Sequence, residues 1–168
     1  MATVKQQFLM EEAEFHSSAF PAIQKNGTNF PVIGLAFDAA ADEAAFFKFK
    51  ASNYGSGNIT LILRWYAANA TSGNVVWEAQ LAAITPDTDS QDVTTDSLAT
   101  LNYIQDTHLG TTSKRIMACS ITLSNLDSLA ADDECWLRIA RDANGTNATD
   151  DMANDAILVG VEIQYSDT

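Results

Sequence analysis

The chain has 168 residues, of which 46% are hydrophobic, and 22 acidic residues against 9 basic ones give it a formal net charge of −13. A chain of this length is expected to form one domain whose core needs no metal or disulfide. The negative charge argues against binding to nucleic acid or to an anionic membrane, since both require a basic face. No apolar run is long enough to span a bilayer, and residues 1–12 lack the basic and apolar segments of a signal peptide.

Residues 1–18 show no clean period, although they contain large apolar side chains. We interpret this segment as an N-terminal arm that orders against a partner, and residues 19–168 as the folded domain. The candidate partner-binding residues of the arm are Phe8, Leu9, Met10 and Phe15.

The clearest pattern follows in residues 58–66, where Ile59, Leu61, Leu63 and Trp65 alternate with more polar neighbours. A period of two places alternate side chains on opposite faces of a sheet. Residues 75–84 alternate in the same way, and the loop between the two runs is rich in turn-forming residues. The two runs therefore predict a long antiparallel hairpin.

Shorter runs of the same kind occur along the rest of the chain. They cover residues 20–25, 31–37, 45–51, 98–104, 115–123, 134–140 and 156–165. About eight strands with no convincing helix, separated by turns and a few long connections, predict an all-β fold. We expect a two-sheet antiparallel sandwich of the jelly-roll type.

The tryptophans differ in the face that they are expected to occupy. Trp65 and Trp77 share a parity with core residues, so we expect both in the core. Trp136 and Arg138 share the face opposite to that of Leu137, so Trp136 and Arg138 are candidates for a partner-binding surface.

Apolar side chains on the outer faces, such as Tyr66, Val76 and Trp136, together with open strand edges, predict homo-oligomerisation. We expect a homotrimer.

Residues typical of catalysis are scarce. His16 and His108 are the only histidines, and neither lies in a nucleophile motif, so we expect both to be solvated and the protein not to be an enzyme. Sugar hydrolysis by a pair of carboxylates is kept as an alternative, although the acidic residues cluster in loops. No catalytic residue or cofactor-binding residue is predicted.

No metal site or cofactor is predicted, although one polar loop is a candidate for calcium. Asp142, Asn144, Asp150 and Asp151 offer oxygen ligands within one polar loop. The loop lacks the ligand spacing of an EF-hand, and turns rich in Asp and Asn also form without metal. A second acidic segment, residues 86–89 with Asp92, is a weaker candidate.

Cys119 and Cys135 both lie at inward positions of expected strands. Two buried thiols in a reducing compartment are the simplest interpretation, while a disulfide would require the two strands to be neighbours in register.

Several segments resemble one module in particular. They are residues 54–61, Arg64 with Trp65, residues 70–77, residues 121–133 and residues 137–142, followed by a terminal strand ending at Tyr165. This pattern is similar to a module of virion structural proteins of tailed bacteriophages, over about residues 20–165. The resemblance implies a β-sandwich that assembles on the virion and catalyses nothing.

Our first interpretation is a capsid decoration or cement protein that binds the major capsid protein and stabilises the shell, because the chain is compact, has an aromatic N-terminal arm and is acidic. Such a protein would be made in the host cytoplasm and would lie on the virion surface. The alternative is a tail or fibre module that binds host-surface carbohydrate, and a third possibility is a small carbohydrate-active enzyme. Location on the capsid or on the tail is left open.

Overall fold

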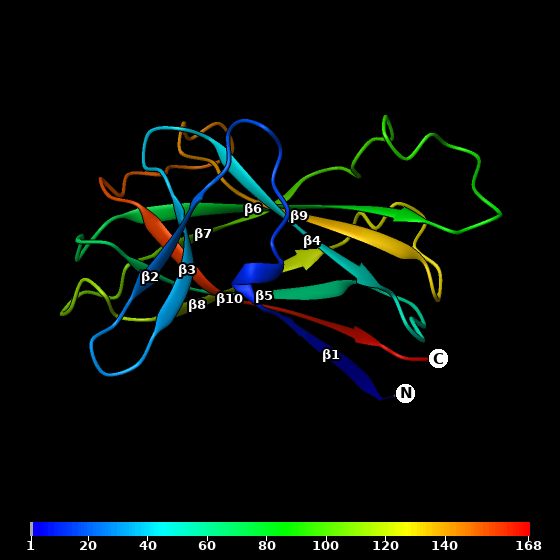
Figure 1. Ribbon diagram of the computed structural model, residues 1–168, viewed down its shortest axis with the longest axis horizontal. Helices are drawn as coiled ribbons and strands as arrows, with labels where there is room; N and C mark the ends of the chain where they lie inside the picture. The colour runs from blue at the N-terminus through cyan, green and yellow to red at the C-terminus, as the bar shows by residue number, and fades with distance from the viewer. Residues whose placement is uncertain (1) are drawn as a thin grey trace.

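The computed structural model describes residues 2–168 and consists of two antiparallel β-sheets packed face to face (Figure 1). Its strands are β1 (Thr3–Phe8), β2 (Ala22–Asn26), β3 (Val32–Phe37), β4 (Glu43–Lys50), β5 (Ile59–Ala67), β6 (Asn74–Ile84), β7 (Asn102–Thr107), β8 (Met117–Leu123), β9 (Glu134–Arg141) and β10 (Ala156–Ser166). A single 3-10 turn, η1 (Met10–Glu12), is the only helical element of the described residues. The predicted all-β sandwich of jelly-roll type is confirmed, with ten strands rather than about eight.

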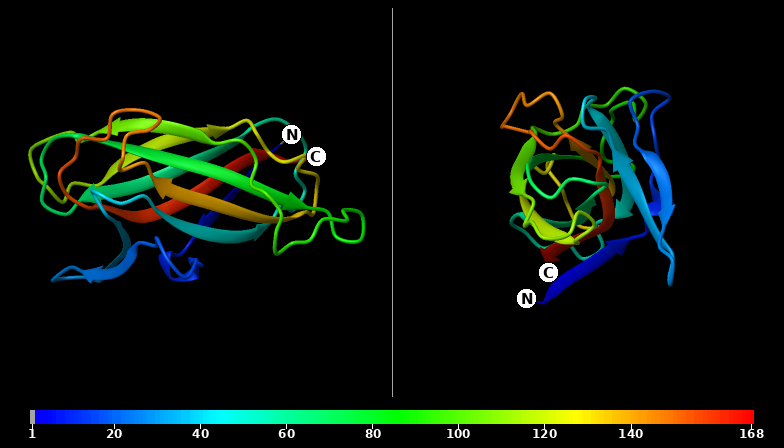
Figure 2. Two further views of the ribbon diagram at one scale, coloured as in Figure 1. Left: turned by 90° about the horizontal axis from the view of Figure 1, so that it is seen from above. Right: turned by 90° about the vertical axis from the view of Figure 1, so that its left-hand side faces the viewer.

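The six-stranded sheet has the order β2-β3-β10-β5-β8, and β1 also pairs with β10. On the side that faces away from β5, β10 pairs first with β3, over Ala156–Leu158, and then with β1, over Val161–Ser166. The two termini therefore lie side by side at one end of the sandwich (Figure 1). The four-stranded sheet has the order β4-β9-β6-β7, and Figure 2 shows the two layers from above and end-on.

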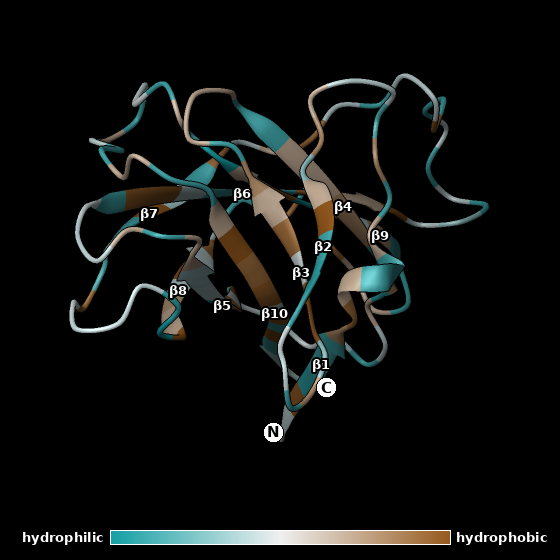
Figure 3. Ribbon diagram, turned by 60° about the vertical axis from the view of Figure 1, so that its left-hand side comes forward, coloured by the Kyte–Doolittle hydropathy of each residue, from teal (hydrophilic) through white to brown (hydrophobic). Residues whose placement is uncertain are grey.

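The core lies between the sheets and is made by the inward face of each alternating strand. Trp65 of β5 and Trp77 of β6 are fully buried there, with ring centroids 6.2 Å apart. Phe37 of β3 meets the Trp77 ring edge-on at 5.2 Å. The bands of hydrophobic and hydrophilic residues along the strands in Figure 3 reflect this alternation.

Residues 3–8 form a strand of the sheet, which differs from the expected N-terminal arm. Phe8 is 6% exposed and packs on Phe47 with ring centroids 5.5 Å apart, and Met10 is also buried in the core. Leu9 between them is 65% exposed. The sequence does not show the period of two in this strand, because the polar Gln6 occupies one of its half-buried positions.

Two of the side chains that led us to expect an exposed apolar outer face are buried. Tyr66 is covered by the β2–β3 hairpin, whose Asn26 donates a hydrogen bond to the Tyr66 hydroxyl over 2.9 Å. Val76 is fully buried, and its backbone N–H donates to the Asp150 carboxylate of the loop that follows β9. The predicted homotrimer, which required these faces to be exposed, is therefore wrong. No helix among residues 2–168 is long and apolar enough to cross a membrane.

Candidate functional site

A groove of about 390 Å³ lies on the outer face of the four-stranded sheet. Its lining comes from the segment before β2, from β4, β6 and β9, and from the loop after β6. The lining residues are Glu14, Phe15, His16, Phe46, Ala82, Ile84, Val93, Thr94, Asp96, Leu98 and Trp136. It therefore combines aromatic rings, small apolar side chains and two carboxylates.

The floor of the groove is set by the register of three strands. Trp136 of β9 lies directly opposite Lys48 of β4 and Ala82 of β6, so the indole occupies the middle of the row. Ala82 is small, which leaves the floor low beside the indole. Neighbouring strands lie about 4.8 Å apart, so a floor from β4 to β6 is roughly 10 Å wide.

One wall is the segment Glu14–His16, which runs beside β4. The backbone N–H of Glu14 donates to the Phe46 carbonyl over 2.8 Å, and the Phe46 N–H donates to the Glu14 carbonyl over 2.9 Å. The His16 ring then stands edge-on to the Phe46 ring, with centroids 4.8 Å apart. These contacts fix the position of both rings at the edge of the groove.

The opposite wall is the loop after β6, drawn in green where it extends from the right-hand end in Figure 1. The loop is braced internally, because the Asp92 carboxylate accepts hydrogen bonds from the N–H and the hydroxyl of Thr94. These two hydrogen bonds hold the pKa of Asp92 below its usual range. The chain then rejoins the sheet where Ala99 N–H donates to the Leu81 carbonyl over 2.7 Å.

The two carboxylates of the groove have unused acceptor atoms. Asp96 accepts one hydrogen bond at Oδ1, from the Ser97 N–H, whereas its Oδ2 is covered and has no partner. The Glu14 side chain makes no hydrogen bond or ion pair with any described residue. A covered acceptor without a partner is costly, by about 1–3 kcal/mol.

Lys48 and Arg138 flank the floor but do not line the groove. The Lys48 ammonium lies 5.1 Å from the centre of the Trp136 ring system and pairs with Glu134 at 3.0 Å. Arg138 donates to Glu78 and to Gln80, over 3.3 and 3.1 Å. Both basic side chains beside the floor therefore already have acidic or amide partners.

The six partner-binding candidates from the sequence are thus separated. Phe15 and Trp136 line the groove, whereas Phe8 and Met10 lie in the core. Leu9 is exposed and lies outside the groove. Arg138 lies beside the groove, where it donates to Glu78 and Gln80. Sequence reasoning missed the other groove residues, because they come from segments that only the strand register brings together.

A second hollow of about 300 Å³ lies on the six-stranded sheet, lined in part by Gln7, Arg64 and Gly160. Beside it, the Glu162 carboxylate accepts hydrogen bonds from Gln164, Gln7 and Arg64, which hold its pKa below the usual range. The polar groups of this hollow are therefore largely paired with one another, and Phe8, its one aromatic lining residue, is buried. The groove on the other sheet is the better candidate for ligand binding.

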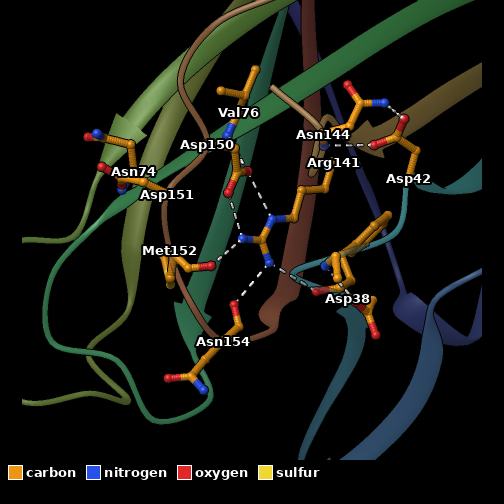
Figure 4. Close-up of polar contacts among 12 residues, drawn as sticks. Asp38, Asp42, Asn74, Val76, Arg141, Asn144, Asp150, Asp151, Met152 and Asn154 are labelled. Carbon is orange, nitrogen blue, oxygen red and sulfur yellow. Dashed lines mark hydrogen bonds and ion pairs between the residues drawn. The ribbon is translucent and has the colours of Figure 1, made fainter. Parts of the chain in front are cut away.

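The candidate calcium loop is stabilised by hydrogen bonds instead. The Asp142 carboxylate accepts from the N–H groups of Thr146 and Asn147, and Asp151 accepts from the Asn74 N–H. Asn144 donates to Asp42, and Asp150 pairs with the buried Arg141 (Figure 4). No group of three or more His, Cys, Asp or Glu side chains in residues 2–168 is arranged to hold a metal ion.

The remaining candidate groups also have structural roles. Cys119 and Cys135 are free, buried and on strands of different sheets, and burial raises the pKa of each thiol to about 12. His108, which we expected to be solvated, is 6% exposed; its Nδ1 accepts a hydrogen bond from the Gly110 N–H, and its Nε2 donates to the Ser113 carbonyl. None of these three side chains lines the groove.

Comparison with known proteins gives similarity at the level of solved structures. No family model matches the chain, and no curated protein matches it. The CBM36-1 domain of a multidomain xylanase from the hindgut metagenome of Trinervitermes trinervoides is 10% identical over 98% of this chain and 100% of its own, with a TM-score of 0.49. The C-terminal CBM6 of LamC, a marine laminarinase from Zobellia galactanivorans, is 10% identical over 95% and 98%, with a TM-score of 0.44. A carbohydrate-binding module CBM36, solved with calcium and xylotriose, is 14% identical over 94% and 98%, with a TM-score of 0.45. Likeness at this level assigns no family.

The resemblance to a bacteriophage virion module is wrong, and with it the cement function and the major capsid protein as partner. The similar structures just described are carbohydrate-binding modules and not virion proteins. The motif residues have local structural roles that any sandwich could require. Gly73 adopts a φ of +105°, and a Cβ there would lie 2.8 Å from the Cα of Met152. Arg141 is the buried partner of Asp150.

Proposed function

We propose that this protein binds a carbohydrate chain in the groove between Glu14–His16 and the loop after β6, and does not cleave it. The observation that carries the proposal is the open groove itself, where Trp136 lies on the floor and the Phe46 and His16 rings stand at one wall. A fold can host many functions, so function is inferred from the residues of this site.

The chemistry of the groove suits a sugar ring. The faces of a pyranose carry C–H groups, which pack on aromatic rings, while its edge carries hydroxyl groups that need hydrogen-bond partners. Trp136 offers the apolar surface, and Asp96, Thr94 and Glu14 offer acceptors around it. Ligand sites commonly combine a mostly apolar lining with a few polar groups of this kind.

The open form of the groove favours an internal stretch of a polymer over a chain end. Its floor crosses three strands, and its walls stand on the β4 and β6 sides. A linear saccharide is therefore expected to lie along the floor, with one ring on Trp136 and with its neighbours continuing out of the groove.

The proposal is tested by calorimetric titration with a panel of soluble glucans, xylans, mannans and amino-sugar polymers. We expect saturable binding to at least one, and Trp136→Ala should weaken it by roughly tenfold or more, equivalent to about 1.4 kcal/mol. Tyr103→Ala is the matched control, because Tyr103 is 49% exposed but does not line the groove. Absence of binding across the panel, or equal effects of the two substitutions, would refute the proposal.

Hydrolysis is tested on the same samples. Glu14 and Asp96 lie on opposite walls of the groove. Glycoside hydrolases also place two carboxyl groups on either side of the sugar, at distances that their mechanism defines. We expect the bound polymer to keep its length on prolonged incubation, and accumulation of shortened products would show an enzyme instead.

A further inference from the structure

The charges in the groove are of one sign. The described residues that line it include the carboxylates Glu14 and Asp96 and no lysine or arginine. Lys48, which lies beside the floor, is already paired with Glu134 at 3.0 Å. The loop that forms the wall adds Asp87, Asp89 and Asp92, and the whole chain has a net charge of −13.

One of the two carboxylates, Asp96, has a covered oxygen without a donor, and the other, Glu14, is exposed to solvent. Asp96 Oδ2 is covered and unpartnered, and the Glu14 carboxylate has no partner among the described residues. The last torsion of an aspartate side chain is soft, so Asp96 can turn Oδ2 toward the groove when a donor arrives. A ligand that brings positive N–H donors would satisfy both groups at once.

We propose that the preferred ligand is a polymer of amino sugars whose free amines are protonated, such as glucosamine units, bound with the ammonium groups toward Asp96 and Glu14. This inference rests on the proposed carbohydrate-binding function and names the class of sugar. An ammonium carries three donors, and a hydrogen bond between charged groups is roughly twice as strong as one between neutral groups.

The aromatic groups of the groove favour the same ligand. Cations are attracted to the faces of aromatic rings, and Trp is the best of them. The Lys48 ammonium lies 5.1 Å from the centre of the Trp136 ring, and its charge is compensated by Glu134 at 3.0 Å. A polymer of uronic acids would instead face Glu14, Asp96 and the acidic loop, and like charges repel.

The experiment compares oligosaccharides of one linkage and one length that differ only at carbon 2. The probes are β-1,4-linked oligomers of glucosamine, N-acetylglucosamine and glucose, titrated by calorimetry at about pH 6, where carboxyl groups of ordinary pKa are ionised. We expect the glucosamine oligomer to bind at least about tenfold more tightly than the other two. Its advantage should shrink as salt is raised from about 0.01 to 1 M, because the Debye length falls roughly tenfold.

Isosteric substitutions identify the groups responsible. Asp96→Asn and Glu14→Gln should each reduce the ratio of the affinity for the glucosamine oligomer to the affinity for the glucose oligomer, because each removes a negative charge and keeps the shape of the side chain. Asp87→Asn is the matched control, because it removes the same charge from the same loop outside the groove, at a positive φ that Asn tolerates. Equal affinities for the three oligomers would overturn this inference alone, whereas absence of binding to any saccharide would overturn the proposed function.

Discussion

Arg141 of β9 and Asp150 of the following loop form a bidentate ion pair inside the protein. The guanidinium donates from Nε to Oδ2 over 2.9 Å and from Nη2 to Oδ1 over 2.7 Å, and the two side chains are 0% and 1% exposed. Further donors of Arg141 reach the carbonyl oxygens of Phe37, Met152 and Asn154 (Figure 4). This one side chain therefore fastens the loop of residues 142–155 to both sheets.

Breaking that ion pair should be costly. Asp150→Asn leaves the buried Arg141 charge without its counterion, and loss of one partner of such a pair costs about 3–5 kcal/mol. Urea unfolding measures the change in the free energy of unfolding. The control is Lys50→Gln, which breaks an exposed pair with Asp132 and should cost at most about 1 kcal/mol. Similar costs for the two variants would contradict the structural role given to Arg141.

The two core tryptophans predict an unequal response to the same substitution. Trp65 donates from Nε1 to Asp106 over 2.7 Å, whereas Trp77 Nε1 is buried without a partner. Trp65→Phe deprives Asp106 of its donor, but Trp77→Phe removes an unsatisfied group. We therefore expect Trp65→Phe to destabilise the protein more, by about 1 kcal/mol, in paired thermal or urea melts. The reverse order would show that packing and not hydrogen bonding governs these sites.

Residues 3–10 are predicted to belong to the folding unit. Phe8→Ala should cost about 3–5 kcal/mol of stability, because Phe8 packs on Phe47 and Phe49 in the core. Leu9→Ala, one residue along, removes a side chain that is 65% exposed and should change stability by less than about 0.5 kcal/mol. Equal and small effects in thermal melts would restore the idea of a separate arm.

The cysteines should be unreactive in the folded protein. Burial, with a smaller contribution from nearby carboxylates, raises the pKa of Cys119 and of Cys135 to about 12, so the reactive thiolate is scarce at neutral pH. A colorimetric thiol reagent should label neither residue readily in the native state and both after denaturation. Rapid labelling of the native protein would contradict the packing of β8 or β9.

The fold was predictable because its signals are local. The alternation of Ile59, Leu61, Leu63 and Trp65 places these side chains in the core, where the structure has them. The strand β1 was missed because Gln6 interrupts the same pattern. The misleading resemblance came from residues such as Gly73 and Arg141, whose identity is explained by a turn and a buried ion pair.

The groove could be predicted only in part. Trp136 alternates with the inward Leu137, which predicts that Trp136 lies on an outer face. In the structure it lies on the groove floor. Nothing local indicates that Glu14 runs beside β4 or that Asp96 faces the same space. Such sites depend on strand order and register, which a single sequence does not specify.

Two-dimensional NMR of the labelled protein maps directly where the saccharide binds. The indole N–H groups of Trp65 and Trp77 are buried internal controls, whereas Trp136 lies in the groove. On titration with the tightest-binding oligosaccharide, we predict shifts confined to the Trp136 indole and to the backbone of residues 14–16 and 93–98. Shifts centred on the hollow beside Arg64, or no shift at saturating ligand, would contradict saccharide binding in the groove.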